Sequence, residues 1–517
     1  MAVKVERSQY PDDMKPVPEP PRKLPEKPQR GFAGIIWFLV AGHYFTWLKF
    51  LPDSFWLDEC GTAWIVQGGF GDLHRRTLLL LHAPLFGAIA TAAASIGGIN
   101  EIALRLPSWI AIGISIYLFS RLAWEVLEPD TAKIALAIFT VWPLVCYSAA
   151  DARPYSFALA ALCGCYLFFL RAIRSGRKRD FAGFCLCGAT LVHLHLLFVY
   201  VLGIPVVFLL LFDLPAARRH RTKWLGSALV LLILLAPLAL HYRVMFMWGS
   251  RYSFSPLPSW FALFAMFAPS RPLFFFMIMT ILCAGFKLHI RFALSPRDRF
   301  GLAFSLLAGL FPIFFLFAVS RLTESGFFVP RYMIPAVPGL ALFWGWVIGR
   351  LEPIAVRYYI GIGALVMILA TQWMIGDWRR ESDDWRGALN RAAVLNKQDD
   401  HALVLYTSYV ESASLEALSK PDHVAFLLAP LAAYPATTAH VVALPLGTNE
   451  ASQAFWDAEF HRAVKARRSF TVVLRAYFYH EWWRDHLIRY AAGHGFRLAN
   501  KENFGKEPHM LLLRFVR

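Results

Sequence analysis

The feature that most constrains this chain is a succession of apolar runs, several of which reach the ~17–25 residues that a helix needs to cross a bilayer. Hydrophobic residues make up 57% of the 517 residues and charged residues only 17%, against about 45–50% and about 25% in soluble domains. A water-soluble enzyme is excluded, and we expect a polytopic α-helical membrane protein. About eleven crossings are expected, at Phe32–Leu48, Leu106–Leu122, Ile134–Ala150, Tyr155–Leu170, Phe181–Val192, Leu194–Phe212, Trp224–His241, Pro272–Phe286, Phe300–Val319, Tyr332–Ile348 and Tyr358–Ile375.

Two apolar stretches need interpretation before the crossings can be ordered. Residues 181–212 as one helix would measure about 48 Å against a hydrocarbon core of ~30 Å, so we expect two short spans joined near His193. The stretch Leu78–Ile96 is interrupted by His82 and Pro84. We expect an interfacial or re-entrant helix there, with a full span as the alternative.

The distribution of positive charge indicates the orientation. If Leu78–Ile96 does not cross, the loops on the side of the N-terminal tail carry 24 Lys and Arg residues and the opposite loops carry 10. Because cytoplasmic loops are the more basic ones, we expect a cytoplasmic N-terminus. Eleven crossings then place the C-terminal region outside. The net charge of +17 is thus explained by membrane topology and does not indicate nucleic-acid binding.

The chain is expected to have three parts and to lie in a bacterial inner membrane. Residues 1–31, rich in Pro, Lys, Arg and Glu, are expected to be a disordered cytoplasmic tail. Residues 32–376 form the transmembrane module, with a first outer loop at 49–105, and residues 377–517 form a small periplasmic α/β domain. The elements expected in that domain are helices at Asp384–Leu395, Glu411–Leu418 and His480–Ala492 and strands at His401–Tyr406, Ser469–Arg475 and Met510–Val516.

Charged residues near the outer ends of spans are the first candidates for function, because a charge beside lipid is costly without a partner. Asp58 and Glu59 lie in the first outer loop among aromatic and apolar residues. They suit a general base that takes the proton of an acceptor hydroxyl, with exposed loop acids or a helix cap as the alternative. Arg153 and Arg331 come from separate outer loops and suit bidentate binding of a phosphate, with membrane anchors or ion-pair partners as the alternative.

The histidines and cysteines form no metal or redox motif. His82, His193 and His195 could bind phosphate or sugar or ligate a metal, but three separated histidines without a tight motif do not make a zinc site. The seven cysteines form no disulfide framework, and no Gly-Lys-Ser/Thr phosphate loop is present. The sequence therefore requires neither a metal nor another cofactor.

Taken in order, these residues resemble the bacterial GT-C glycosyltransferases related to protein O-mannosyltransferases and to the lipid A aminoarabinose transferase. Two positions depart from the family pattern: Ala83 replaces a proline and Asp151 replaces a glutamate. The shorter acid makes Asp151 a weaker candidate than Arg153. The resemblance covers residues 32 to about 390 and is carried by Trp56-Leu57-Asp58-Glu59, His82-Ala83-Pro84-Leu85, Arg105-Leu106-Pro107-Ser108, Tyr147–Tyr155, Pro330-Arg331-Tyr332 and Asp384-Trp385-Arg386.

The resemblance implies the GT-C fold and transfer of a sugar, with inversion, from a polyprenyl-phosphate donor to a hydroxyl of a lipid, polysaccharide or protein acceptor. It implies that Asp58 is the general base and that Glu59 positions Asp58 or the acceptor. Arg153 and Arg331, with His82, would hold the departing phosphate. It also implies that Tyr155 and Tyr332 line the pocket. Asp151 and His193 are further candidates for binding the donor.

Two other functions are open at this point. A transporter or flippase of lipid-linked sugars would place charges at mid-membrane, often in repeated halves, whereas here the charges gather at one side and no internal repeat is visible. A non-catalytic assembly subunit with the same fold is the second alternative, and the acid pair at 58 and 59 argues mildly against it.

Overall fold

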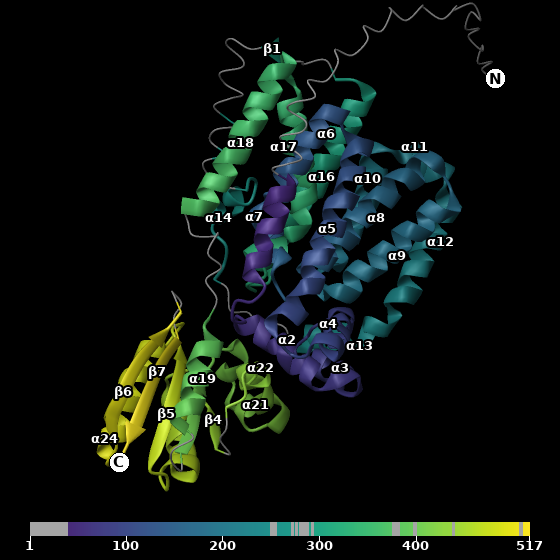
Figure 1. The fold of residues 1–517 in the computed structure, drawn as a ribbon. Helices are drawn as coiled ribbons and strands as arrows, with labels where there is room; N and C mark the ends of the chain where they lie inside the picture. Colours follow the sequence, from purple (N-terminus) through teal and green to yellow (C-terminus); the bar gives the residue numbers. More distant parts are fainter. Residues whose placement is uncertain are drawn as a thin grey trace, which may run out of the picture.

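The structure, a computed structural model, describes residues 40–248, 256–269, 273–274, 278, 289–290, 294–374, 383–396, 401–436, 440–505 and 510–517. A tall helical module and a smaller mixed domain are stacked along the long axis of the molecule (Figure 1). The predicted tail lies outside the described residues, as does most of the predicted span Pro272–Phe286. Residues 40–46 of the first predicted span are helical and lead into η1 (Trp47–Phe50).

Within the described residues, six helices are long and apolar enough to cross a membrane, and a bent pair makes a seventh. All seven coincide with predicted crossings, so the chain is a multi-pass membrane protein, although the count of eleven is not confirmed. The seven are α5 (Glu101–Val126), α8 (Tyr155–Ser175), α12, η3 and α13 together (Arg221–Met247), α16 (Pro296–Leu322), η5 with α17 (Pro330–Gly349), α18 (Ile354–Met374) and the bent pair α6 (Pro129–Thr140) and α7 (Pro143–Ala149).

The bent pair corrects the expectation of one continuous span over Ile134–Ala150. The axes of α6 and α7 meet at 58°. Pro143 opens α7, and the preceding Trp142 is extended, because proline donates no backbone hydrogen bond and disfavours helical geometry in the residue before it. The predicted division of residues 181–212 is present, since α9 (Lys178–Leu194) ends and η2 (Leu196–Leu202) begins across the extended residue His195.

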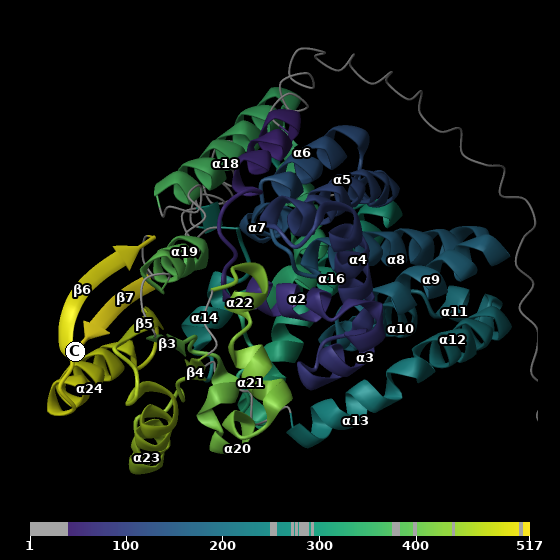
Figure 2. The ribbon, with the colours of Figure 1, turned by 60° about the horizontal axis from the view of Figure 1, so that its bottom comes forward.

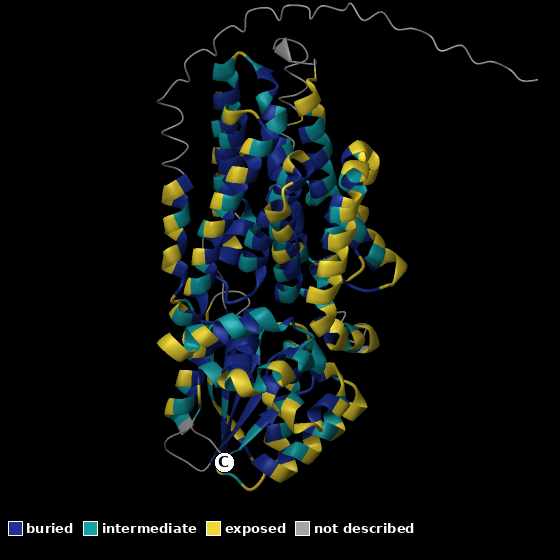
Figure 3. Ribbon diagram, turned by 90° about the vertical axis from the view of Figure 1, so that its right-hand side faces the viewer, coloured by how far each residue is buried: buried dark blue, intermediate teal, exposed yellow. Residues whose placement is uncertain are grey.

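Side-chain burial separates an inner set of membrane helices from an outer set. In α8, 78% of an apolar segment of 18 residues is buried. In the helical run Arg221–Met247, only 17% of such a segment is buried. Exposed residues accordingly follow the outward faces of the helices (Figure 3). The helices α16 and α17 approach each other closely, and a Cβ on Gly339 would overlap the backbone of Gly309. Small residues at such crossings let helix backbones touch.

Three short helices close the end of the module that faces the C-terminal domain: α2 (Leu57–Gln67), α3 (Gly69–Leu79) and α4 (Pro84–Gly97). The 14 residues of α4 measure about 21 Å, short of the ~30 Å hydrocarbon core. The stretch Leu78–Ile96 is therefore no full crossing in this structure. Seen from this end, α2 lies beside α22 (Pro430–Ala433) of the C-terminal domain (Figure 2).

The C-terminal domain contains a five-stranded sheet in the order β4-β3-β5-β7-β6. The strands are β3 (His401–Tyr406), β4 (Val441–Ala443), β5 (Ser469–Arg475), β6 (Arg497–Phe504) and β7 (Met510–Val516). β3 runs parallel to β4 and β5, whereas β7 is antiparallel to β5 and β6. The main helices are α19 (Trp385–Asn396), α23 (Glu450–Glu459) and α24 (His480–Gly493).

One predicted helix of this domain is wrong in form. The predicted helix Glu411–Leu418 is two short turns, η6 (Val410–Ala413) and α20 (Leu415–Leu418), separated by the extended residue Ser414. The carbonyl of Ser412 accepts a hydrogen bond from the backbone of Leu446 at 3.0 Å. This tertiary contact holds η6 at the end of β3, next to the membrane module.

Candidate functional site

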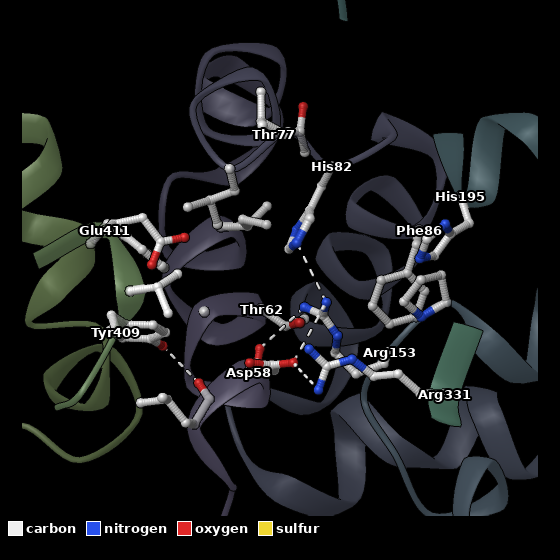
Figure 4. A pocket seen from close by; sticks show the side chains of 18 of the residues that line it. Asp58, Thr62, Thr77, His82, Phe86, Arg153, His195, Arg331, Tyr409 and Glu411 are labelled. Carbon is white, nitrogen blue, oxygen red and sulfur yellow. Dashed lines mark hydrogen bonds and ion pairs between the residues drawn. The ribbon is translucent and has the colours of Figure 1, made fainter. Parts of the chain in front are cut away.

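A cavity of about 480 Å³ lies where α2, the α3–α4 link, the start of η2, η5 and the C-terminal domain meet. Its polar lining comes from segments that are far apart in the sequence (Figure 4). The lining includes Asp58, Thr62, His82, Arg153, His195, Arg331, Tyr332, Ser408, Tyr409, Glu411 and Arg475. A second part of the lining is apolar and includes Phe86, Leu194, Leu196, Leu197 and Met245.

Asp58 lies in the first turn of α2 and faces two guanidinium groups. Its Oδ2 is 3.4 Å from Nη1 of Arg331 and 4.0 Å from Nη2 of Arg153. Nη1 of Arg153 also donates to the backbone carbonyl of Asp58 at 3.3 Å. The structure thus brings together the three residues that the sequence singled out from three separate segments.

His82 extends this cluster from the α3–α4 link. Its Nε2 is 3.4 Å from Nη2 of Arg153. Burial and the charges of Arg153, His195 and Arg331 hold the pKa of His82 well below its usual value, so the ring is neutral and accepts from the guanidinium through Nε2. The cluster therefore contains two fixed cations and one carboxylate, and the excess positive charge suits an anion.

Aromatic rings hold the guanidinium of Arg331. Its central carbon lies 5.7 Å from the ring centroid of Trp56 and 5.6 Å from that of Tyr332. Such cation–π contacts favour a fixed orientation of the guanidinium group. Tyr332 lines the cavity, as expected from the sequence.

Glu59 and Asp151 do not line the cavity but hold the segments that do. Glu59 is fully buried, pairs with Arg105 at 2.5 Å and accepts from the backbone of Ala152 at 2.7 Å. Its carboxylate also accepts from the backbone N–H of Trp56 at 3.2 Å, at the start of α2. Asp151 accepts from Nε1 of Trp56 at 2.9 Å.

Arg105 fixes the first loop from the membrane side. Its guanidinium donates to the carbonyls of Phe50, Leu51 and Ser54 at 3.0 to 3.1 Å, in addition to its pair with Glu59. The Arg105-Leu106-Pro107-Ser108 motif is therefore a support for the loop that carries Asp58.

Tyr155 and His193 lie outside the cavity lining. Tyr155 is buried behind it, with its ring centroid 5.6 Å from that of His195. Nε2 of His193 lies 2.9 Å from the carbonyl oxygen of Leu234. His195, two residues further on, is the histidine of this pair that lines the cavity, because the chain turns there between α9 and η2.

Residues of the C-terminal domain that the sequence did not assign to the site hold the peptide groups beside Asp58. The backbone nitrogen of Leu57 donates to Asp383 at 3.1 Å, and the carbonyl of Leu57 accepts from the hydroxyl of Tyr409 at 2.6 Å. Asp383 is itself paired with Arg475 at 2.8 Å. The sequence signal that could have found Asp383 is its position directly before the Asp384-Trp385-Arg386 motif.

That motif docks the domain onto the first loop. Asp384 accepts from the backbone of Gly387 at 2.8 Å and so caps α19, whereas Trp385 is fully buried. Arg386 donates to the carbonyl of Pro52 at 2.9 Å and pairs with Glu101 at 3.3 Å.

Glu411 lies in η6 and lines the cavity from the C-terminal domain. Its Oε2 is buried and has no hydrogen-bond partner among the residues that the structure describes. Burial, together with the charge of Asp58, raises the pKa of Glu411 to about 7. Over that same part of the chain, no group of three His, Cys, Asp or Glu side chains is arranged to hold a metal ion.

Comparisons with known proteins find similarity in part of the sequence and in the fold. Residues 81–241 match the family model described as dolichyl-phosphate-mannose-protein mannosyltransferase. ArnT from Cupriavidus metallidurans bound to undecaprenyl phosphate superposes with a TM-score of 0.59 at 13% identity, over 93% of this chain and 98% of that chain. Its apo state gives a TM-score of 0.56 at 13% identity, over 94% and 98%. No curated protein sequence gives a significant match.

At 13% identity the likeness to ArnT shows the fold, and that fold extends over nearly the whole chain. The mostly helical membrane module with a small mixed-sheet domain is the predicted architecture. The predicted fold is thus confirmed by the likeness to ArnT, and residues 81–241 are similar to the dolichyl-phosphate-mannose-protein mannosyltransferase family.

Proposed function

We propose, from the premise that this chain has the GT-C fold, that it is an integral membrane glycosyltransferase. It moves a sugar from a polyprenyl-phosphate donor to an acceptor hydroxyl on the periplasmic side of a bacterial inner membrane, with its N-terminus in the cytoplasm. The observation that carries this proposal is the cluster of Asp58, Arg153 and Arg331 in one cavity.

The two arginines bind the donor phosphate. Both arginines are paired with Asp58 in the structure, and a bound phosphate competes for the same guanidinium protons. As these turn towards the phosphate, the carboxylate of Asp58 becomes available as a base. Their effect is largest when the bond to the sugar breaks, because the phosphate oxygen then gains negative charge.

Asp58 is the general base. It takes the proton of the acceptor hydroxyl while the hydroxyl oxygen forms a bond to the anomeric carbon, on the face opposite the phosphate. The bond between that carbon and the phosphate oxygen breaks, and its electron pair leaves with the phosphate. The configuration at the anomeric carbon is inverted. A positioned base of this kind contributes about 10²–10⁴ in rate.

The apolar part of the cavity supports a lipid-linked donor. Side chains such as Phe86, Leu196 and Met245 continue from the charged cluster, so they offer an apolar path for the first prenyl units behind the phosphate. ArnT from Cupriavidus metallidurans has been solved with undecaprenyl phosphate, which supports the same class of lipid carrier here.

The test is to compare the glycans and glycolipids of cells with and without this protein. Asp58→Asn, expressed at matched membrane abundance, is expected not to restore the missing product. Asp72→Asn is the matched control, because Asp72 lies on the neighbouring α3 and does not line the cavity. Full restoration by Asp58→Asn would refute the assignment of the base.

The orientation needs its own experiment. A reporter fused after Arg517 is expected to give a periplasmic signal. A cytoplasmic signal would place the cavity on the wrong side of the membrane for the proposed reaction.

A further inference from the structure

The cavity has two walls of different chemistry. The membrane-side wall consists of Asp58, His82, Arg153, Arg331 and Tyr332, whose charged groups interact with one another. The C-terminal wall includes Ser408, Tyr409, Glu411, Arg475, Tyr477 and Phe478. The reaction proposed above uses only the membrane-side wall, so the C-terminal wall has no role yet.

Glu411 supplies an unused hydrogen-bonding group on the C-terminal wall. The described residues leave its Oε2 without a partner, and a buried polar atom in that state is costly. A ligand hydroxyl that donates to this carboxyl group would remove the cost. Figure 4 shows Glu411 and Asp58 on opposite sides of the same space, so a molecule that touches Glu411 can also present a hydroxyl to Asp58.

Two aromatic side chains, those of Tyr477 and Phe478, line the same cavity as Glu411. Tyr477 and Phe478 are 46% and 44% exposed although they are large and apolar. Their ring centroids are 4.3 Å apart at 72°, and the guanidinium of Arg475 lies 4.9 Å from the ring centroid of Tyr477. Phe478 has a φ of +50°, which is unfavourable for a bulky residue and is retained mainly where function or packing requires it.

Exposed aromatic rings and a hydrogen-bonding carboxyl group that line one cavity fit a sugar. A sugar ring has C–H groups on its faces, which pack on aromatic rings, and hydroxyl groups on its edge, which donate to carboxyl oxygens. A phosphate or carboxylate ligand is disfavoured next to the carboxyl group of Glu411, and the cation of this wall, Arg475, is already paired with Asp383 at 2.8 Å. The membrane-side arginines attract the anionic donor instead.

We propose that the C-terminal wall is the acceptor subsite and that it binds a neutral saccharide. The ring of the acceptor sugar packs on Tyr477 and Phe478, and one of its hydroxyls donates to Glu411. A second hydroxyl is thereby held at Asp58, where it is glycosylated. This inference rests on the proposed function and makes it narrower: the acceptor is a glycan and not a peptide or an acyl lipid.

The test is photo-crosslinking in cells with the full chain. Tyr477 is replaced by p-benzoylphenylalanine, and the mass of the adduct is determined after irradiation. An adduct that contains hexose or another sugar unit is expected. An adduct of phospholipid alone would identify these rings as membrane-interface anchors, and that result, an adduct of peptide, or no adduct at all would overturn the proposal.

Further substitutions show whether the wall acts as one subsite. Glu411→Ala and Phe478→Ala are each expected to lower the yield of the saccharide adduct at position 477 about tenfold. Tyr479→Ala is the matched control and is expected to leave the yield unchanged, because Tyr479 is 51% exposed but does not line the cavity. Equal yields in all of these variants would contradict a defined acceptor subsite.

A separate measurement distinguishes failure of this inference from failure of the proposed function. Binding of undecaprenyl phosphate to the purified full-length protein is followed by native mass spectrometry. Binding that is lost in Arg331→Ala but kept in Glu411→Ala is expected, since the two walls bind different molecules. If the wild-type protein fails to bind this lipid, the donor assignment is wrong, whatever the crosslinking experiment shows.

Discussion

The two walls of the cavity differ in what they leave unsatisfied. On the membrane-side wall, Asp58 is 3.4 Å from Arg331, and Arg153 contacts His82, so each charge has a partner and positive charge is in excess. On the C-terminal wall, one oxygen of Glu411 has no partner among the described residues, and two large rings are half exposed. On the membrane-side wall, a bound phosphate can replace the carboxylate of Asp58 as the partner of the arginines. The C-terminal wall is suited to bind uncharged polar groups.

The two walls are also held in position by different parts of the structure. The membrane-side wall is held from behind by the buried pair of Arg105 and Glu59. The C-terminal wall reaches the cavity only because the domain docks on the first loop through contacts such as that of Arg386 with Pro52. Each wall can therefore be disturbed without changing a residue of the other.

The largest expected effect comes from removing the support of the membrane-side wall. Arg105→Ala leaves Glu59 buried without its cation, which costs about 3–5 kcal/mol of stability, and a clear drop in melting temperature of the detergent-purified protein is expected. Arg391→Ala, which breaks a partly exposed pair with Glu502, is the control and is expected to change the melting temperature little. Equal drops in both variants would show that the buried pair is not a special support.

The next effect concerns the charge of the membrane-side wall. Arg331→Ala is expected to lower the rate of sugar transfer about 10²–10³-fold, the usual cost of losing one donor to a developing anion. The measurement is the initial rate in membranes at matched protein abundance. Arg321→Ala serves as control, because Arg321 is exposed at the end of α16. A rate within twofold of wild type for Arg331→Ala would contradict the proposal that Arg331 binds the donor phosphate.

A smaller effect is expected where the C-terminal domain touches the helix of Asp58. Tyr409→Phe removes the hydrogen bond to the carbonyl of Leu57, a contribution of about 0.5–1.5 kcal/mol. If that energy is used to place Asp58, the transfer rate falls by up to about tenfold, whereas the binding of undecaprenyl phosphate is unchanged. Loss of lipid binding in this variant would mean that the two walls are not separable.

The smallest effect is a dependence of stability on pH. Asp58, His82 and Arg153 face Glu411 across the cavity (Figure 4), and the pKa of Glu411 in the fold is about 7, above the ordinary value of 4.5. Between these values the folded state binds more protons than the unfolded state, so this group's contribution to stability is lost as pH rises from 4.5 through 7. Glu411→Gln is expected to flatten that part of a plot of melting temperature against pH. Identical plots for both proteins would contradict the assignment.

Part of this fold could be predicted because local pattern decides it. Strands β3, β5 and β7 have the predicted bounds, since each is a short apolar run. β6 was missed because its sequence, Arg497–Phe504, is mostly polar and lies at the sheet edge. The bend between α6 and α7 was also missed, although Pro143 gives a local reason for it.

Only the membrane-side wall of the candidate site could be predicted from the sequence. The order of motifs indicated that Asp58, Arg153 and Arg331 belong together. A helical turn also explains why only one of the two adjacent acids faces the cavity, since consecutive residues of a helix point in different directions. The contribution of Glu411 depends on how two domains dock, and nothing local in the sequence encodes that contact.

The hydrogen bonds to the peptide groups next to Asp58 link the membrane module to the C-terminal domain and so limit how the two can evolve. Both the N–H and the C=O of Leu57 are held by side chains from beyond residue 380, those of Asp383 and Tyr409. A chimaera that joins this membrane module to the C-terminal domain of a distant relative can therefore insert and fold, and still carry a misplaced aspartate. We therefore expect recombination between relatives to preserve function only when the first loop and the C-terminal domain are inherited together.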